Sequence, residues 1–231
     1  MAVSDAEIAM TPEAQELVQE LLLVWLEFER RLGHVPILRR IDQCAFSLED
    51  YRSLLCNLRA QVVDGSRWIT RAASSFSADY AELRSMVIGH AYDEHRDYEM
   101  LERDFVAVGG ALEKIRSAER NIGTEALTAY LMHQASQPNP VELLGAMFII
   151  EGLGNRMASH WARSIQDSLG VSAETTTFLS YHGANDEAHL AKLHAIVNSE
   201  AVTEVVAPRI VKTAKVVARL YALQLEELNH V

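Results

Sequence analysis

The chain has 231 residues, of which 49% are hydrophobic, so it can bury one sizeable core and does not have the composition of a disordered protein. Its formal net charge is −11, with acidic residues spread along the chain, which argues against nucleic acid or an anionic membrane as a partner. It contains two cysteines, and its N-terminus lacks a basic flank and an apolar segment. These features predict a cytoplasmic protein with a single domain over residues 1–231.

Apolar residues recur at a spacing of three and four along almost the whole chain, which predicts an all-α fold. Thr11 and Pro12 are suited to begin a first helix, which Gly33 ends, and Ser47 begins a capping-box pattern at the start of a helix that reaches about residue 75. The other predicted helices span about 37–43, 77–108, 111–123, 124–136, 141–170, 173–199 and 201–231. When the shortest of these segments are left out, they predict a bundle of seven or eight helices.

The segment GHAYDEHRDYEM places several ionisable residues within the predicted helix 77–108. Positions 0, 4 and 7 of a helix lie within roughly 60° of one another, and His90, Glu94 and Asp97 have this spacing. Apolar residues before and after them share their face, so the three are expected to point into the core. His95 is rotated away from this stripe and Asp93 lies at its flank, so both are interpreted as surface residues.

Two further predicted helices carry polar residues on an apolar face. In FLSYHGANDEAHLAKLHAIV, His182, Asp186 and His189 again occupy positions 0, 4 and 7. In LLGAMFIIEGLGN, Glu151 is a lone carboxylate in an apolar run, and a kink is expected at the glycines that follow it.

A single histidine on a core face is more often a hydrogen-bonded structural residue than a ligand, and a lone glutamate beside glycines can simply stabilise a kink. Three such stripes are harder to explain in this way, because an unpaired ion costs several kcal/mol to bury. Four carboxylates and three imidazoles are typical of di-iron or di-manganese sites in helical bundles. The predicted ligands are His90, Glu94, Asp97, Glu151, His182, Asp186 and His189.

The same three segments resemble the haem-oxygenase-like superfamily, in particular its iron-containing redox enzymes, the haem-oxygenase-like di-iron oxidases and oxygenases. FLSYHGANDEAH is similar to the family's late H-x3-D-x2-H ligand motif, and NPVELLGAMFIIEGLG to its apolar helix with one ligand glutamate. The E-x2-D-x3-L-x2-D frame that starts at Glu94 resembles a segment in which the family has a ligand histidine at the position of Asp97. The resemblance covers about residues 34–200.

This resemblance implies a single haem-oxygenase-like domain that holds two Fe(II) ions, with manganese as an alternative metal and O2 as cosubstrate. It implies an oxygenase or oxidase that acts on a small amine, amino acid or carboxylate, with Glu151 and Asp97 in catalytic positions. Asn155, Ala158 and Gln61 are the expected substrate contacts. A homodimer and an external reductant are the remaining candidate partners.

Two alternatives come from the same superfamily and a third from outside enzymology. A haem oxygenase needs a proximal histidine, and His34 is the only candidate near the first helix. A metal-free thiaminase-like hydrolase or quinone-cofactor synthase could use Cys44 or Cys56 as its nucleophile. The third alternative is a non-enzymatic helical binding protein.

Overall fold

The structure is a computed structural model that describes residues 10–184 and 196–229. All regular elements in these two ranges are helical, which confirms the predicted all-α fold. The α-helices are α1 (Pro12–Leu32), α2 (Pro36–Asp42), α3 (Leu48–Val62), α4 (Gly65–Ser75), α5 (Ala81–Glu94), α6 (Tyr98–Ala107), α7 (Leu112–Arg116), α8 (Ile122–Ala135), α9 (Leu144–Leu153), α10 (Ser159–Leu169) and α12 (Ala207–Glu226). Short 3-10 turns are Ala78–Tyr80, Val141–Leu143, Ala173–Thr175 and Glu227–Asn229, and residues 177–184 are also helical.

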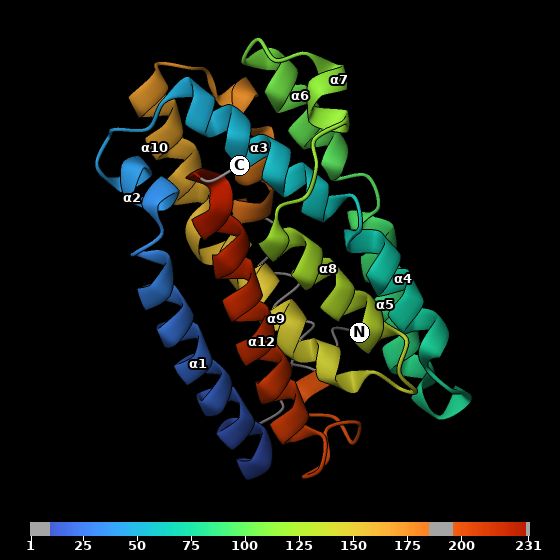
Figure 1. Ribbon diagram of the computed structural model, residues 1–231. Helices are drawn as coiled ribbons and strands as arrows, with labels where there is room; N and C mark the ends of the chain where they lie inside the picture. The colour runs from blue at the N-terminus through green and yellow to red at the C-terminus, as the bar shows by residue number, and fades with distance from the viewer. Residues whose placement is uncertain (1–9, 185–195, 230–231) are drawn as a thin grey trace, which may run out of the picture.

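The first and last long helices lie side by side on one flank of the bundle (Figure 1). α1 begins as predicted, because the side chain of Thr11 accepts a hydrogen bond from the backbone of Ala14 and Pro12 takes the first helical position. α12 also packs against α8 and α9, so it joins α1 to these two helices. A Cβ on Gly145 of α9 would overlap the backbone oxygen of Ile210, so glycine is what permits the close approach of α9 to α12.

Several long helices predicted from periodicity are divided in the structure. The segment 48–75 is two helices, α3 and α4, which are separated at Val63 and Asp64. The segment 77–108 is likewise divided into α5 and α6 by a turn at residues 95–97. The predicted helix 111–123 is reduced to the short α7. Hydrophobic period alone does not reveal these breaks, because the residues at each break remain close to helical backbone angles and keep the period.

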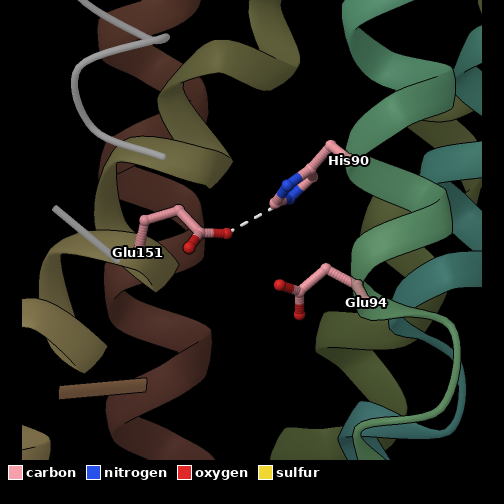
Figure 2. Close-up of side chains that lie close together, drawn as sticks. All are labelled: His90, Glu94 and Glu151. Carbon is pink, nitrogen blue, oxygen red and sulfur yellow. Dashed lines mark ion pairs between the residues drawn. The ribbon is translucent and has the colours of Figure 1, made fainter. Parts of the chain in front are cut away.

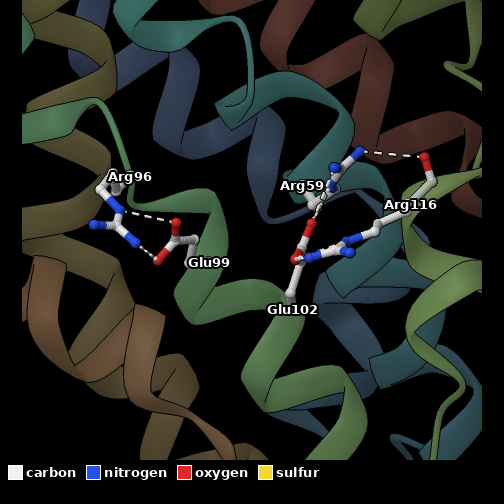
Figure 3. Close-up of polar contacts among 5 residues, drawn as sticks. All are labelled: Arg59, Arg96, Glu99, Glu102 and Arg116. Carbon is white, nitrogen blue, oxygen red and sulfur yellow. Dashed lines mark hydrogen bonds and ion pairs between the residues drawn. The ribbon is translucent and has the colours of Figure 1, made fainter.

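The packing of α6 against α3 and α7 includes an ion network centred on the buried Glu102 (Figure 3). One carboxylate oxygen of Glu102 accepts hydrogen bonds from Arg59 at 3.2 and 3.0 Å, and the other accepts two from Arg116 at 3.0 and 2.7 Å. Burial would raise the pKa of Glu102, but the hydrogen bonds from the two arginines outweigh it and hold the pKa below its ordinary value. Glu102 therefore stabilises the fold above the ordinary pKa of glutamate, and this stabilisation is lost as the pH falls through the lowered value.

Glu102→Ala is expected to destabilise the protein by about 3 kcal/mol, because it leaves the partly buried guanidinium of Arg59 without its counter-ion. The free energy of unfolding from urea titrations at pH 7 measures this. Glu99→Ala is the matched control on the same helix, since Glu99 pairs with the exposed Arg96 and its loss should cost about 0.5 kcal/mol or less. Equal effects of the two substitutions would contradict the interpretation.

None of the helices in the described ranges combines the length and the apolar character that a membrane span requires.

Candidate metal centre

Two helices that are distant in the sequence bring three of the predicted ligands together (Figure 2). His90 and Glu94 come from adjacent turns of α5, and Glu151 comes from α9. His90 Nε2 lies 3.2 Å from Oε1 of Glu151, and both side chains are buried. Each of the three offers one potential ligand atom, and these atoms all lie within 4.8 Å of one another.

A second group of three lies beside the first. Asp97 follows the end of α5, and His182 comes from the helical residues 177–184. His182 Nε2 is 3.3 Å from Oδ2 of Asp97, and potential ligand atoms of Glu94, Asp97 and His182 again lie within 4.8 Å of one another. Glu94 belongs to both groups, so the two groups share one carboxylate.

The donor set can be compared with what different metals require. The five side chains are three carboxylates and two imidazoles, with no thiolate, a combination suited to iron or manganese rather than to structural zinc. Two groups that share one carboxylate match the arrangement of di-metal sites in helical bundles. The chemistry of each group, His90 with Glu94 and Glu151 or Glu94 with Asp97 and His182, therefore fits a metal ion of this kind.

The electrostatics of the centre are dominated by Glu94. Burial, together with the nearby carboxylates of Glu151 and Asp97, raises the pKa of Glu94 to about 7, although His182 and His90 oppose the rise. Without a cation, the close carboxylates repel one another, and a proton on Glu94 relieves the repulsion. A metal ion would replace that proton and compensate the same charge.

Asp97 reaches the centre although the helix that was predicted to carry it is broken. His95 and Asp97 keep right-handed helical backbone angles within the turn, so the angular position of Asp97 changes little relative to α5. Asp97 is buried, whereas His95 and Asp93 are exposed, as the helical phase predicts.

Glu151 precedes a π-helical turn at Gly154–Ala158 that joins α9 to α10. This turn is the form taken by the predicted kink, and single π turns within helices are frequent at functional sites. The extra residue in the turn changes the angular spacing after Glu151. Ala158 consequently lines the cavity next to the metal centre, whereas Asn155 is not among the described residues that line it.

The helix that carries His182 is held in place by Asp104, a residue for which the sequence predicted no role. One carboxylate oxygen of Asp104 accepts hydrogen bonds from the backbone and the hydroxyl of Thr177 at 3.0 and 2.6 Å, and the other accepts one from the backbone of Phe178 at 3.0 Å. Asp104 is fully buried, and burial raises its pKa despite these bonds. Asp104 is the last aspartate of the E-x2-D-x3-L-x2-D frame, and this pattern is the feature of the sequence that could have pointed to it.

Asp104→Asn is expected to destabilise the protein by about 2 kcal/mol, because the amide nitrogen cannot accept from a backbone N–H. It should also weaken the metal position that includes His182, since the start of that helix would move. Urea unfolding and iron stoichiometry measure the two effects. Asp79→Asn, at an exposed position, is the control and should change neither; an unaltered stability in Asp104→Asn would show that Asp104 does not hold the helix.

A largely apolar cavity opens beside the centre and includes His90, Glu94, Glu151 and His182 in its wall. Gln61 from α3 and Ala158, two of the three predicted substrate contacts, also line it, and their role in substrate binding stays a prediction. Most of its remaining wall is apolar: Leu58, Val62, Trp68, Ile69, Met147, Ile150, Leu153, Trp161, Phe178 and Leu179.

The residues of the alternative functions lie elsewhere. His34 is exposed between α1 and α2, Cys44 is exposed, and Cys56 borders a different cavity. The predicted ligands Asp186 and His189 fall outside the described residues, so their part in the centre stays a prediction.

The sequence also matches a known protein family. Residues 61–222 match the family described as iron-containing redox enzymes, a range that includes all five described residues of the centre. No curated protein matches the sequence.

Solved structures share the fold at low identity. A domain of unknown function with a haem oxygenase-like fold from Shewanella denitrificans has a TM-score of 0.86 at 18% identity, over 93% of this chain and 92% of that one. A TenA homologue from Pseudomonas syringae pv. tomato has a TM-score of 0.74 at 12% identity, over 97% and 99% of the two chains. A TenA homologue from P. horikoshii has a TM-score of 0.74 at 14% identity, over 95% and 98%. The protein therefore has a haem oxygenase-like fold, and by its sequence match it belongs to the family of iron-containing redox enzymes.

Proposed function

We propose that this protein is a non-haem di-iron oxygenase or oxidase that uses O2 to oxidise a small amine, amino acid or carboxylate. The observation that carries the proposal is the position of Glu94, which contributes to two adjacent groups of potential ligands. Membership of an iron-containing redox family supports iron as the metal, with manganese as the alternative.

The chain's own residues would hold the metals and shape the site around them. His90 and Glu151 would bind one ion, Asp97 and His182 the other, and Glu94 both. Iron bound there would supply the electrons for the reduction of O2. The apolar wall formed by residues such as Trp161 and Phe178 would keep water from the reacting groups and orient an apolar part of the substrate.

Two observations weigh against the alternatives. A haem oxygenase would need a proximal histidine near the first helix, and the candidate there, His34, is exposed and is not among the described residues that line the cavity. A thiaminase-like reaction would need a thiol there, and Cys44 and Cys56 are likewise absent from that wall. Likeness to TenA homologues is a likeness of fold.

Metal analysis after anaerobic reconstitution with Fe(II) tests the proposal. We expect two irons per chain, followed by O2 consumption when the loaded protein is exposed to air. One iron per chain would contradict a di-iron site, and none would refute the metal centre. A haem titration that produced a Soret band would favour the haem oxygenase alternative instead.

His95→Ala is the matched control for this experiment. His95 is next to Glu94 in the sequence but is exposed, and its Nδ1 lies 2.6 Å from the backbone oxygen of Tyr92. Its removal should leave two irons bound. Loss of iron in this variant would show that the metal is held outside the proposed centre.

A further inference from the structure

A chain of polar side chains crosses the core and ends at Gln61 in the wall of the cavity. Asn57 Nδ2 donates to Thr124 Oγ1 at 3.0 Å, and the Thr124 hydroxyl donates to Gln224 Oε1 at 3.0 Å. Gln224 Nε2 then donates to Gln61 Oε1 at 2.9 Å. Thr124 and Gln224 are fully buried and Asn57 is nearly so, so water does not compete with these bonds.

This chain of hydrogen bonds from Asn57 to Gln61, called the relay below, passes through the contact between α8 and α12. A Cβ on Gly123 would overlap the backbone of Gln224, so glycine there lets the two helices approach closely enough to enclose the Gln224 side chain. The backbone oxygen of Gln224 accepts a further hydrogen bond from Asn121 Nδ2 at 2.8 Å. These contacts hold Gln224 in one place on α12 and present its amide to Gln61.

The direction of the relay determines what Gln61 offers to the cavity. Because the Gln61 oxygen accepts from Gln224, the Gln61 Nε2 group is the part left to act as a donor toward a bound molecule. A bound molecule must therefore supply a hydrogen-bond acceptor at this end. The described residues that line the cavity include neither lysine nor arginine, so a carboxylate near Gln61 would be buried without a counter-ion.

We propose that Gln61 selects substrates that carry a neutral carbonyl acceptor, such as a ketone or carboxamide oxygen, at the end of a largely apolar skeleton. This inference rests on the proposed function for its assumption that the cavity receives the substrate. Any charged group of the substrate would lie at the opposite end, where the metal ions provide compensation. Thr124 and Gln224 are positioning residues, which act by orienting the Gln61 amide.

Binding of two seven-carbon probes with different end groups tests the proposal: 2-heptanone and 1-heptylamine. Trp68 and Trp161 line the cavity, so tryptophan fluorescence reports binding directly. The purified full chain is titrated in both its metal-free and its Fe(II)-loaded anaerobic forms. The test can therefore succeed or fail whether or not the protein binds two irons or consumes O2.

In the Gln61→Leu variant, which keeps the size of the side chain but removes the donor, we expect the affinity for 2-heptanone to fall roughly tenfold. The affinity for 1-heptylamine should stay the same, because a cationic donor gains nothing from the Gln61 amide. Met147→Leu is the matched control, since it alters the cavity wall without removing a polar group and should change the two affinities by the same factor.

Thr124→Val tests the relay itself, because it keeps the shape of the residue and removes the hydroxyl that orients Gln224. It should lower the affinity for 2-heptanone about threefold, with no loss for 1-heptylamine. The proposal is overturned if 2-heptanone does not bind the wild type, or if Gln61→Leu leaves ketone binding unchanged. It is also overturned if Gln61→Leu weakens 1-heptylamine instead, which would mean that Gln61 presents its oxygen.

Discussion

Replacement of Glu94 with glutamine is expected to abolish the binding of both irons while it stabilises the metal-free protein. A glutamine amide has one neutral oxygen, so it cannot bridge two cations as a carboxylate can, and each group of ligands loses a negative charge. Iron stoichiometry after anaerobic reconstitution should fall from two per chain to none. Retention of both irons in Glu94→Gln would show that Glu94 does not join the two positions.

The stability change has the opposite sign and depends on pH. The folded pKa of Glu94 is about 7 against an ordinary value of 4.5, so the folded protein binds more protons than the unfolded chain between these values. Stability of the metal-free protein therefore falls as the pH rises through this window, by about 3 kcal/mol in full. Glu94→Gln removes this cost.

Urea unfolding of the two metal-free proteins at pH 8 and pH 5 measures the effect. The variant should be more stable than the wild type at pH 8, and the difference should shrink toward pH 5, where Glu94 of the wild type is protonated. Glu99→Gln, on the neighbouring helix α6 and paired with an exposed arginine, is the control and should show no comparable dependence. A Glu94→Gln variant that is less stable at pH 8 would refute the electrostatic description of the centre.

His90→Ala and His182→Ala are expected to remove one iron each. The two histidines belong to different groups of ligands. His90→Ala should therefore keep the iron in the group of His182, and His182→Ala should keep the iron in the group of His90. Loss of a direct ligand should weaken the affected position by about a hundredfold or more, since loss of a supporting hydrogen bond alone typically costs ten- to a hundredfold. Anaerobic Fe(II) titrations followed by metal analysis should give one tightly bound iron per chain in each variant.

The double variant is the decisive comparison for this prediction. If the two positions are separate, His90→Ala combined with His182→Ala should bind no iron tightly. Circular dichroism of all the metal-free variants checks that helical content is retained. Complete loss of iron in either single variant would mean that the two ions bind only as a pair, and full retention in both would place the metal elsewhere.

Much of the fold and of the site was predictable because the relevant signals are local. Helical period depends only on nearby residues, so it placed His90, Glu94 and Asp97 on a core face and His95 outside it. The start of α1 and of α3 followed from capping residues that bond to backbone groups within the next turn. The breaks at residues 63–64 and 95–97 were missed, because short turns that stay near helical angles do not disturb the period.

The sequence by itself determined the all-α class and the inward position of His90, Asp97 and Glu151. Only the tertiary structure decided that Glu94 lies between two groups of ligands, that Asp104 holds the helix of His182, and that Gln224 orients Gln61. The physical reason is that a helix face is specified by contacts within a few residues. The meeting of two faces depends instead on packing between segments far apart in the chain, such as α9 with α12 or α8 with α12, where one glycine sets how closely the two backbones approach.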